Sequence, residues 1–171
     1  NSTPTVSMNN SGVVVAAVQG EQGDQLFSWV GQYSTTEVQW HARRIIASPA
    51  THSSIAINDH NIVVAVYQKD VNLFWHIGKV IVSTTSELGI SSPPVDPSEG
   101  NPIRLDIVWG ASGAYDIGIS PSVSINNDGA VVAVHTRTNL NDASVGWRVG
   151  VIDTTNSDPS STSTTSSTSA T

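Results

Sequence analysis

The chain of 171 residues contains no cysteine and few charged residues. The absence of cysteine excludes disulfide bonds, thiol catalysis and zinc sites with cysteine ligands. Lys and Arg together number 7, against 14 Asp and Glu, which gives a formal net charge of −7. Because no segment gathers basic side chains, the composition disfavours nucleic acid as a partner.

Long apolar segments are also missing. The longest apolar run, residues 13–18, is far shorter than the roughly 20 residues that a membrane-spanning helix needs, so we expect no membrane span. Charged residues make up only 12% of the chain, whereas Ser, Thr, Asn and Gly are abundant. This balance is more typical of secreted β proteins than of intracellular enzymes, and we expect an extracellular or cell-surface protein. N-glycosylation patterns at Asn1 and Asn9 would suit a secreted glycoprotein, although chance matches in an Asn- and Ser-rich chain are the favoured interpretation.

One segment of sixteen residues occurs three times, at 4–19, 53–68 and 121–136. The first and third copies are identical at nine of the sixteen positions, more than composition explains. Each copy has two short apolar stretches around a turn rich in Asn, Asp and Gly, which are the residues that tight hairpins need for positive φ. The repeated segment is therefore predicted to be a β-hairpin.

Further apolar segments follow each hairpin and lengthen the repeat. A third segment with aromatic residues occurs at 26–31, 73–78 and 145–150. A fourth segment, which contains a Trp and leads into the next copy, occurs only twice, at 38–42 and 107–118. The repeat unit is therefore four strands long.

Four-stranded units at this spacing indicate a propeller blade or a related β array, because one small sheet cannot bury both of its faces alone. The segments 13–18, 62–67 and 130–135 are continuously apolar, which predicts equivalent strands buried on both sides. The predicted fold class is all-β, with three four-stranded repeats of the β-propeller blade type. A threefold β-prism and a β-trefoil-like monomer stay open as alternatives.

The chain is expected to form one β-repeat domain, residues 1–156, followed by a tail. The copies begin near residues 4, 53 and 121, and the longer second interval is explained by a Pro-, Gly- and Ser-rich surface loop inserted at 86–104. The Ser/Thr-rich tail at 157–171 is either a linker or a strand-exchange segment.

The repeat count is incomplete for a closed propeller. Three copies with two Trp strands give eleven strands where three full units need twelve, and the pattern places the missing strand before Pro4. An unpaired sheet edge is a template for another strand. We therefore predict that the tail or a neighbouring molecule covers this edge, and that the protein associates with itself as a homo-oligomer or a fibre.

The third copy carries the fullest set of motifs, namely Trp109, Tyr115-Asp116, Pro121-Ser122-Val123, Asn127-Asp128-Gly129, Val131 to His135, and Trp147-Arg148-Val149-Gly150. These motifs resemble the repeats of bacterial and fungal lectin-like β-propellers. The resemblance extends over most of residues 4–152 and is weakest in the second copy, where Ser53 replaces Pro and Asn61 replaces Gly. It implies a propeller-like fold and carbohydrate binding.

The aromatic residues supply the candidate binding site. Repeated Trp is more often core than ligand contact, and strand alternation predicts that Trp75 and its counterpart Trp147 lie in the core. Sugar-binding proteins stack an aromatic ring on the sugar and orient the sugar with polar side chains. The residues that we expect to contact a glycan are Trp40, Trp109, Trp29, His76 and Arg148.

No motif supports catalysis or a bound cofactor. The histidines form no HxxxH or HxH pair, and the chain has no GxSxG motif and no phosphate-binding glycine loop. Residues 124–129 faintly resemble a calcium-binding loop, but Val132 occupies the place of the later carboxylate that such a loop requires. We expect a protein that is not an enzyme and that binds no metal and no cofactor.

Two functions from different classes compete. The first is a secreted, non-catalytic protein that self-associates and binds carbohydrate, with linked weak sites that raise the affinity. The second is a structural subunit of an extracellular filament or surface layer, assembled by strand addition. Self-association is common to both.

Overall fold

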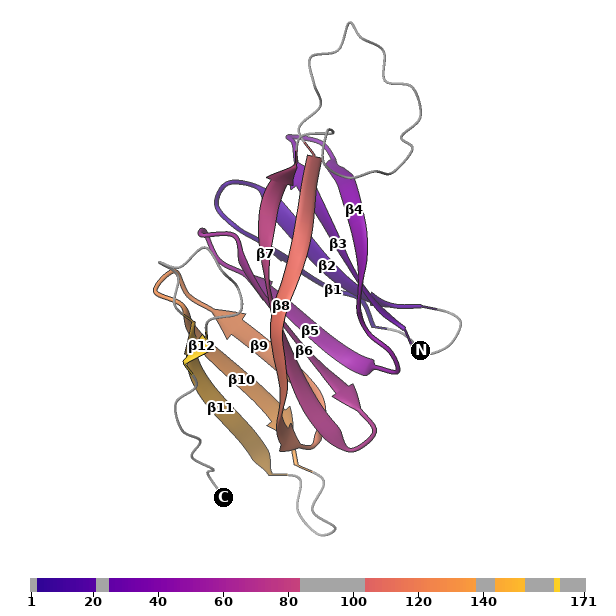
Figure 1. The fold of residues 1–171 in the computed structure, drawn as a ribbon, viewed down its shortest axis with the longest axis vertical. Coiled ribbons are helices and arrows are strands. Elements are labelled where there is room, and N and C mark those ends of the chain that lie inside the picture. Colours follow the sequence, from indigo (N-terminus) through magenta and orange to yellow (C-terminus); the bar gives the residue numbers. More distant parts are fainter. Residues whose placement is uncertain (1–2, 21–24, 84–103, 138–143, 153–161, 164–171) are drawn as a thin grey trace, which may run out of the picture.

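The computed structural model describes residues 3–20, 25–83, 104–137, 144–152 and 162–163. The regular elements in these ranges are all β-strands, so no helix among them is long and apolar enough to cross a membrane. Three antiparallel sheets follow one another in chain order (Figure 1). The predicted inserted loop, apart from Arg104, and most of the predicted tail lie outside the described residues.

Each sheet is built from strands that are consecutive in the chain. The first sheet contains β1 (Thr5–Met8), β2 (Val13–Gln19), β3 (Leu26–Tyr33) and β4 (Val38–Ala47). The second sheet contains β5 (Thr51–Ile57), β6 (Ile62–Lys69), β7 (Asn72–Ser83) and β8 (Arg104–Ile117). The third sheet contains β9 (Ile119–Ile125), β10 (Ala130–Thr136), β11 (Val145–Ile152) and the two-residue β12 (Thr162–Ser163). The all-β prediction is confirmed for the described residues.

The two Trp strands belong to the sheet of the copy before them. Trp40 on β4 pairs with β3, and Trp109 on β8 pairs with β7. The prediction that a strand is missing before Pro4 is therefore wrong, because the Trp strand is the last strand of its unit and not the first. The incomplete sheet is the third one, where among the described residues only Thr162–Ser163 pairs with the outer strand β11.

Two hydrophobic cores hold the sheets together. The first core lies between the first and second sheets and includes Val15, Leu26, Ile57 and Val63. The second core lies between the second and third sheets and is formed by Ile62, Val64, Ile77 and Ile152, with Trp75, Val123, Ile125 and Val131 packed against it. The second sheet is thus covered on both faces.

The prediction of three equivalent buried strands is correct for two of them. Val13 to Ala17 on β2 and Ile62 to Tyr67 on β6 are buried. On β10 burial alternates: Ala133 is buried, whereas Val132 and Val134 are 43% and 38% exposed. The reason is that no further sheet among the described residues covers the outer face of the third sheet. Trp75 packs against the second core as predicted, whereas its counterpart Trp147 is half-buried and belongs to neither core.

The hairpin turns of the three sheets have the same geometry. In each turn an Asn side-chain oxygen accepts a hydrogen bond from the backbone N–H four residues later, at 2.9 Å for Asn9, 3.0 Å for Asn58 and 2.8 Å for Asn126. The position before this N–H has positive φ, with values of 79° at Gly12, 61° at Asn61 and 82° at Gly129. Asn is among the non-glycine residues that adopt this conformation most readily, so its replacement of Gly in the second copy keeps the turn.

The three turns are also joined to one another. The side-chain amide of Asn9 donates to the backbone carbonyl of Asn58 at 3.2 Å, and that of Asn58 donates to the carbonyl of Asn126 at 3.1 Å. One step further out, the carboxylate of Asp59 accepts hydrogen bonds from both Asn10 and Asn127. These contacts fix the relative positions of the sheets at the turn end of their inner strands.

Candidate functional site

The outer face of the third sheet is apolar and exposed. Val132 lies opposite Val149, which is 39% exposed, and Val134 lies opposite Trp147. Val151 extends the same surface, with 44% of its area exposed. This row of valines beside a Trp leaves apolar area in water, and association with another apolar surface would remove that area from water.

The corresponding surface of the second sheet is covered. There Val64 lies opposite Ile77, and Val66 lies opposite Trp75. Val64 and Ile77 are only 2% and 5% exposed, because the third sheet packs on them. The third sheet therefore presents in the open the kind of surface that the second sheet buries.

The outer face of the first sheet is apolar and aromatic. Val6, Met8 and Ile45 are 68%, 56% and 56% exposed on this face. The counterparts of Val6 and Met8 in the second sheet are Ile55 and Ile57, which are buried against the first sheet. In the part of the chain that the structure describes, no other sheet thus covers the first sheet at the positions where the second sheet is covered.

Aromatic side chains and one cation form a cluster on this face. The rings of Trp29 and Trp40 meet edge to face, with their centroids 6.3 Å apart. The guanidinium carbon of Arg43 lies 4.7 Å from the ring centroid of Phe27 and 5.7 Å from that of Trp29. Since Trp40 is 44% exposed, the cluster offers an aromatic surface with a positive charge beside it.

The five predicted sugar-binding residues fall into three places. Trp29 and Trp40 lie together on the first sheet. His76 and Trp109 lie together on the second sheet, with ring centroids 5.1 Å apart, and burial lowers the pKa of His76. Arg148 lies apart from both pairs, on β11 of the third sheet. The Phe27 and Arg43 contacts were not predicted, because only the strand register brings β4 beside β3 in this alignment.

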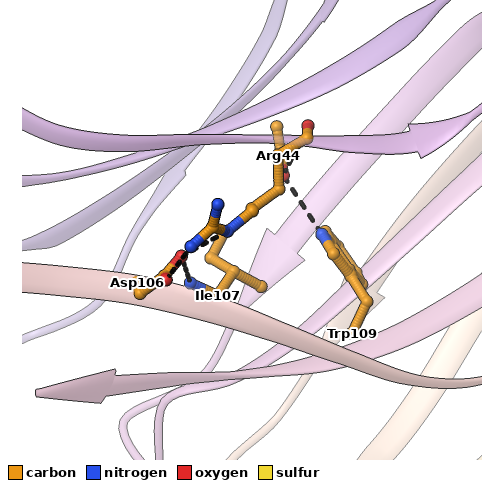
Figure 2. Close-up of polar contacts among 5 residues, drawn as sticks. Arg44, Asp106, Ile107 and Trp109 are labelled. Atoms are coloured by element: carbon orange, nitrogen blue, oxygen red, sulfur yellow. Dashed lines mark hydrogen bonds and ion pairs between the residues drawn. The ribbon is translucent and has the colours of Figure 1, made fainter. Parts of the chain in front are cut away.

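Trp109 contacts the first sheet instead of facing solvent. Its indole nitrogen donates a hydrogen bond to the hydroxyl of Ser28 at 3.2 Å (Figure 2). Its ring packs against the first core. Ser28 occupies the position at which the other two sheets have Trp75 and Trp147. The small residue leaves room for the ring of Trp109, which explains the exception in the repeated Trp pattern.

A second polar contact links the same two sheets. Arg44 on β4 donates from Nε to Oδ1 of Asp106 at 2.9 Å and from Nη2 to Oδ2, as Figure 2 shows. Asp106 also accepts from the backbone N–H of Ile107 at 2.8 Å. The hydrogen bonds from Arg44 raise the pKa of its guanidinium. No sequence signal marks this pair, since its members are separated by 62 residues.

A third polar cluster lies where β8 meets the third sheet. Arg148 Nη2 lies 3.0 Å and His135 Nε2 lies 3.4 Å from Oδ2 of Asp116, and Arg148 Nε donates to the carbonyl of Tyr115 at 3.2 Å. The side chain of His135 is fully buried. Burial lowers the pKa of His135, opposed by the charge of Asp116, and burial raises the pKa of Tyr115. These contacts give Arg148 a structural partner inside the protein.

The described residues contain no group of three or more His, Cys, Asp or Glu side chains that could hold a metal ion. Asp106 and Asp116, two carboxylates near opposite ends of the Trp strand β8, are each paired with an arginine. Their side chains point to different places in the fold, so the two carboxylates do not form a common site.

Comparison with protein-family models, with curated proteins and with solved structures finds no match for this chain. The lectin-like resemblance therefore stays an expectation from the sequence.

Proposed function

We propose that this chain is a non-catalytic, extracellular β-repeat protein of the propeller-blade type that associates with copies of itself. In this proposal the outer face of the third sheet in one copy packs on the outer face of the first sheet in the next copy. The observation that carries the proposal is the exposure of the Val132–Val149 pair, whose counterpart in the second sheet, Val64–Ile77, is buried.

The packing inside the chain supplies the pattern for this association. The first sheet packs on the second, and the second packs on the third. In both contacts the same face of one sheet packs on the opposite face of the next sheet. A third step of the same kind joins the third sheet to the first sheet of another copy. Such a contact is heterologous, so repetition gives a closed ring or an open fibre. Two copies would supply six sheets, within the range of four to eight blades in closed propellers.

Complementary variants test the order of the contact. One variant carries Val132→Lys and Val149→Lys on the third sheet, and the other carries Met8→Lys and Ile45→Lys on the first sheet. Each variant alone is expected to be monomeric in sedimentation velocity, because one of its two faces is charged. A mixture is expected to form a one-to-one dimer, because each variant keeps the face that the other has lost.

The matched control is Val71→Lys, since Val71 is 61% exposed in the turn between β6 and β7 and lies on neither face. It should leave the association unchanged. A wild-type protein that stays monomeric at the highest soluble concentration would contradict the proposal. Self-association of the Met8→Lys, Ile45→Lys variant would show that third sheets pair with each other, which contradicts the head-to-tail order.

Assembly by strand addition is the structural alternative. Thr162 and Ser163 pair with Ile152 and Val151 at the edge of the third sheet, and a neighbouring molecule could supply the same two residues. Deletion of residues 157–171 distinguishes the two routes. It should leave face-to-face association intact, whereas it would abolish assembly by exchanged tails.

Carbohydrate binding is the second candidate function, favoured by the cluster of Trp29, Trp40 and Arg43. An exposed ring beside a guanidinium can stack on the C–H face of a sugar and bond to its hydroxyl groups. The same face cannot hold a sugar and a second copy at once. Competition between soluble glycans and self-association would therefore support sugar binding at this face.

A further inference from the structure

A cavity of about 230 Å³ lies where β1, β5 and β9, the inner strands of the three sheets, begin, at the end opposite the Asn turns. Residues from all three sheets line it. They are Thr3, Gln19, His52, Ser53, Ser120 and Pro121. The cavity is separate from the two outer faces, so a ligand can bind in it whether or not the protein self-associates.

Three of the lining residues are at equivalent positions of the repeat, namely Thr3 before β1, His52 on β5 and Ser120 on β9. Each of them lies three residues before an apolar residue that pairs with an alanine of the next strand. Equivalent positions of the three sheets therefore meet at the cavity, because the inner strands β1, β5 and β9 lie side by side. Each sheet contributes one polar side chain at this position.

The backbone is irregular at two of these positions. The pairing of β5 with β6 shifts between Thr51 and Ser54, so His52 and Ser53 lie in a bulge. The pairing of β9 with β10 shifts in the same way, so Ser120 and Pro121 lie in a second bulge. Bulges of this kind redirect side chains and are enriched beside binding sites.

Both bulges hold a non-glycine residue in the left-handed region. The φ angle is 44° at His52 and 54° at Ser120. Such a conformation is costly for residues other than Gly, and it tends to occur where a particular side chain is needed at a ligand site. The second and third sheets thus share this strained conformation at equivalent positions, and neither has Gly there.

The chemistry of the lining defines the class of ligand. Hydroxyl groups of Thr3, Ser53 and Ser120, the amide of Gln19 and the imidazole of His52 both donate and accept hydrogen bonds. Among the described residues, the lining contains no Asp, Glu, Lys or Arg. A compact neutral ligand with many hydroxyl groups fits these donors and acceptors, whereas a strongly charged ligand would find no counter-charge among the six lining residues.

We propose that this cavity binds a single neutral sugar residue, held by the side chains of His52 and Ser120 from the two bulges. Sugar at this place would be distinct from sugar on the Trp29–Trp40 cluster. A ligand of about a dozen non-hydrogen atoms binds weakly, with a dissociation constant on the order of millimolar. Glucose, galactose, mannose, fucose and N-acetylglucosamine are suitable probes.

Titration followed by amide chemical shifts in NMR tests the site. At least one of these sugars should move the amide signals of His52, Ser53 and Ser120 in a saturable way. The double variant His52→Gly, Ser120→Gly should weaken that binding tenfold or more. Its melting temperature should rise, because glycine adopts positive φ without steric cost. Weaker binding in a more stable protein cannot be explained by loss of folding.

Asp70→Gly is the matched control. Asp70 also has positive φ, at 56°, but it lies in the turn between β6 and β7 and does not line the cavity. This variant should gain stability and keep full sugar binding. The proposal is overturned if no sugar of the panel moves the cavity signals, if the double variant binds as well as the wild type, or if the shifts centre on Trp29 and Trp40.

Discussion

Arg44 on β4 donates two hydrogen bonds to the carboxylate of Asp106 on β8, and this pair joins the first sheet to the second. Asp106 is almost fully buried, with 8% of its side chain exposed, whereas Arg44 keeps 37%. The carboxylate thus depends on the arginine for compensation of its charge, while the arginine can still be hydrated. Loss of Arg44 and loss of Asp106 should therefore lower the free energy of unfolding by unequal amounts.

Asp106→Ala should lower the free energy of unfolding by about 2 kcal/mol, because it leaves a guanidinium and the Ile107 N–H without their acceptor. For a chain of this length that corresponds to a fall of roughly 4–8 °C in melting temperature. Urea denaturation of Asp106→Ala, Arg44→Ala and the double variant measures the coupling between the two residues. The exposed Asp128→Ala is the control, and an equal loss in both aspartate variants would contradict the assigned role.

The Asn turns should differ in their contribution to stability although they have the same geometry. Asn58 is 3% exposed and its side chain bonds to Ile62, His60 and the next turn. Asn58→Ala should cost about 3 kcal/mol, because several buried polar groups lose their partners. Asn126→Ala, in the exposed third turn, should cost about 1 kcal/mol. Chemical denaturation checks the order, which equal losses at both positions would refute.

His135 should make the protein less stable in mild acid. Burial lowers its pKa in the folded state below the ordinary value of 6.5, so the unfolded chain binds the proton more readily. The stability that this group contributes is present above pH 6.5 and is lost as the pH falls through the lower, folded-state pKa. Asp116, Arg148 and Arg137 act on the same imidazole, and the two arginines reinforce the shift.

Unfolding midpoints in urea at several pH values between 7.5 and 5 measure this loss. The variant His135→Asn should have a shallower dependence on pH, although His41 and His76, whose pKa values are also lowered by burial, still contribute to the slope. An NMR titration in which His135 takes up its proton at or above pH 6.5 would contradict the assignment.

The two Trp residues of the fourth strands should respond differently to removal. Trp109→Ala should cost about 3 kcal/mol, because its ring packs against the first core and its N–H bonds to Ser28. Trp40→Ala should change stability by less than about 1 kcal/mol, since the ring is 44% exposed. Thermal denaturation compares the two losses.

A glycan array with the folded Trp40→Ala protein then separates the candidate functions. Loss of glycan binding would place a sugar on the aromatic cluster. Weaker self-association without any glycan binding in the wild type would favour the stacking of copies. An unchanged array signal together with unchanged association would show that Trp40 serves neither function.

The sequence alone determined the strands and their turns. The hairpins were predictable because Asn9, Asn58 and Asn126 stand at the same place in three similar segments, and local turn chemistry depends on residues that are close in the chain. The burial of β6 and the core position of Trp75 were also predictable, since a continuously apolar strand and strand alternation are local patterns.

The tertiary structure decided which faces are covered. β10 is nearly as apolar as β6, yet Val132 and Val134 are exposed, because burial depends on whether another sheet lies alongside. The same reason separates Trp40 from Trp109, which look alike in the sequence. The cavity beside His52 and Ser120 and the Arg44–Asp106 pair join residues that are far apart in the chain, and only the register and stacking of the sheets bring such residues together.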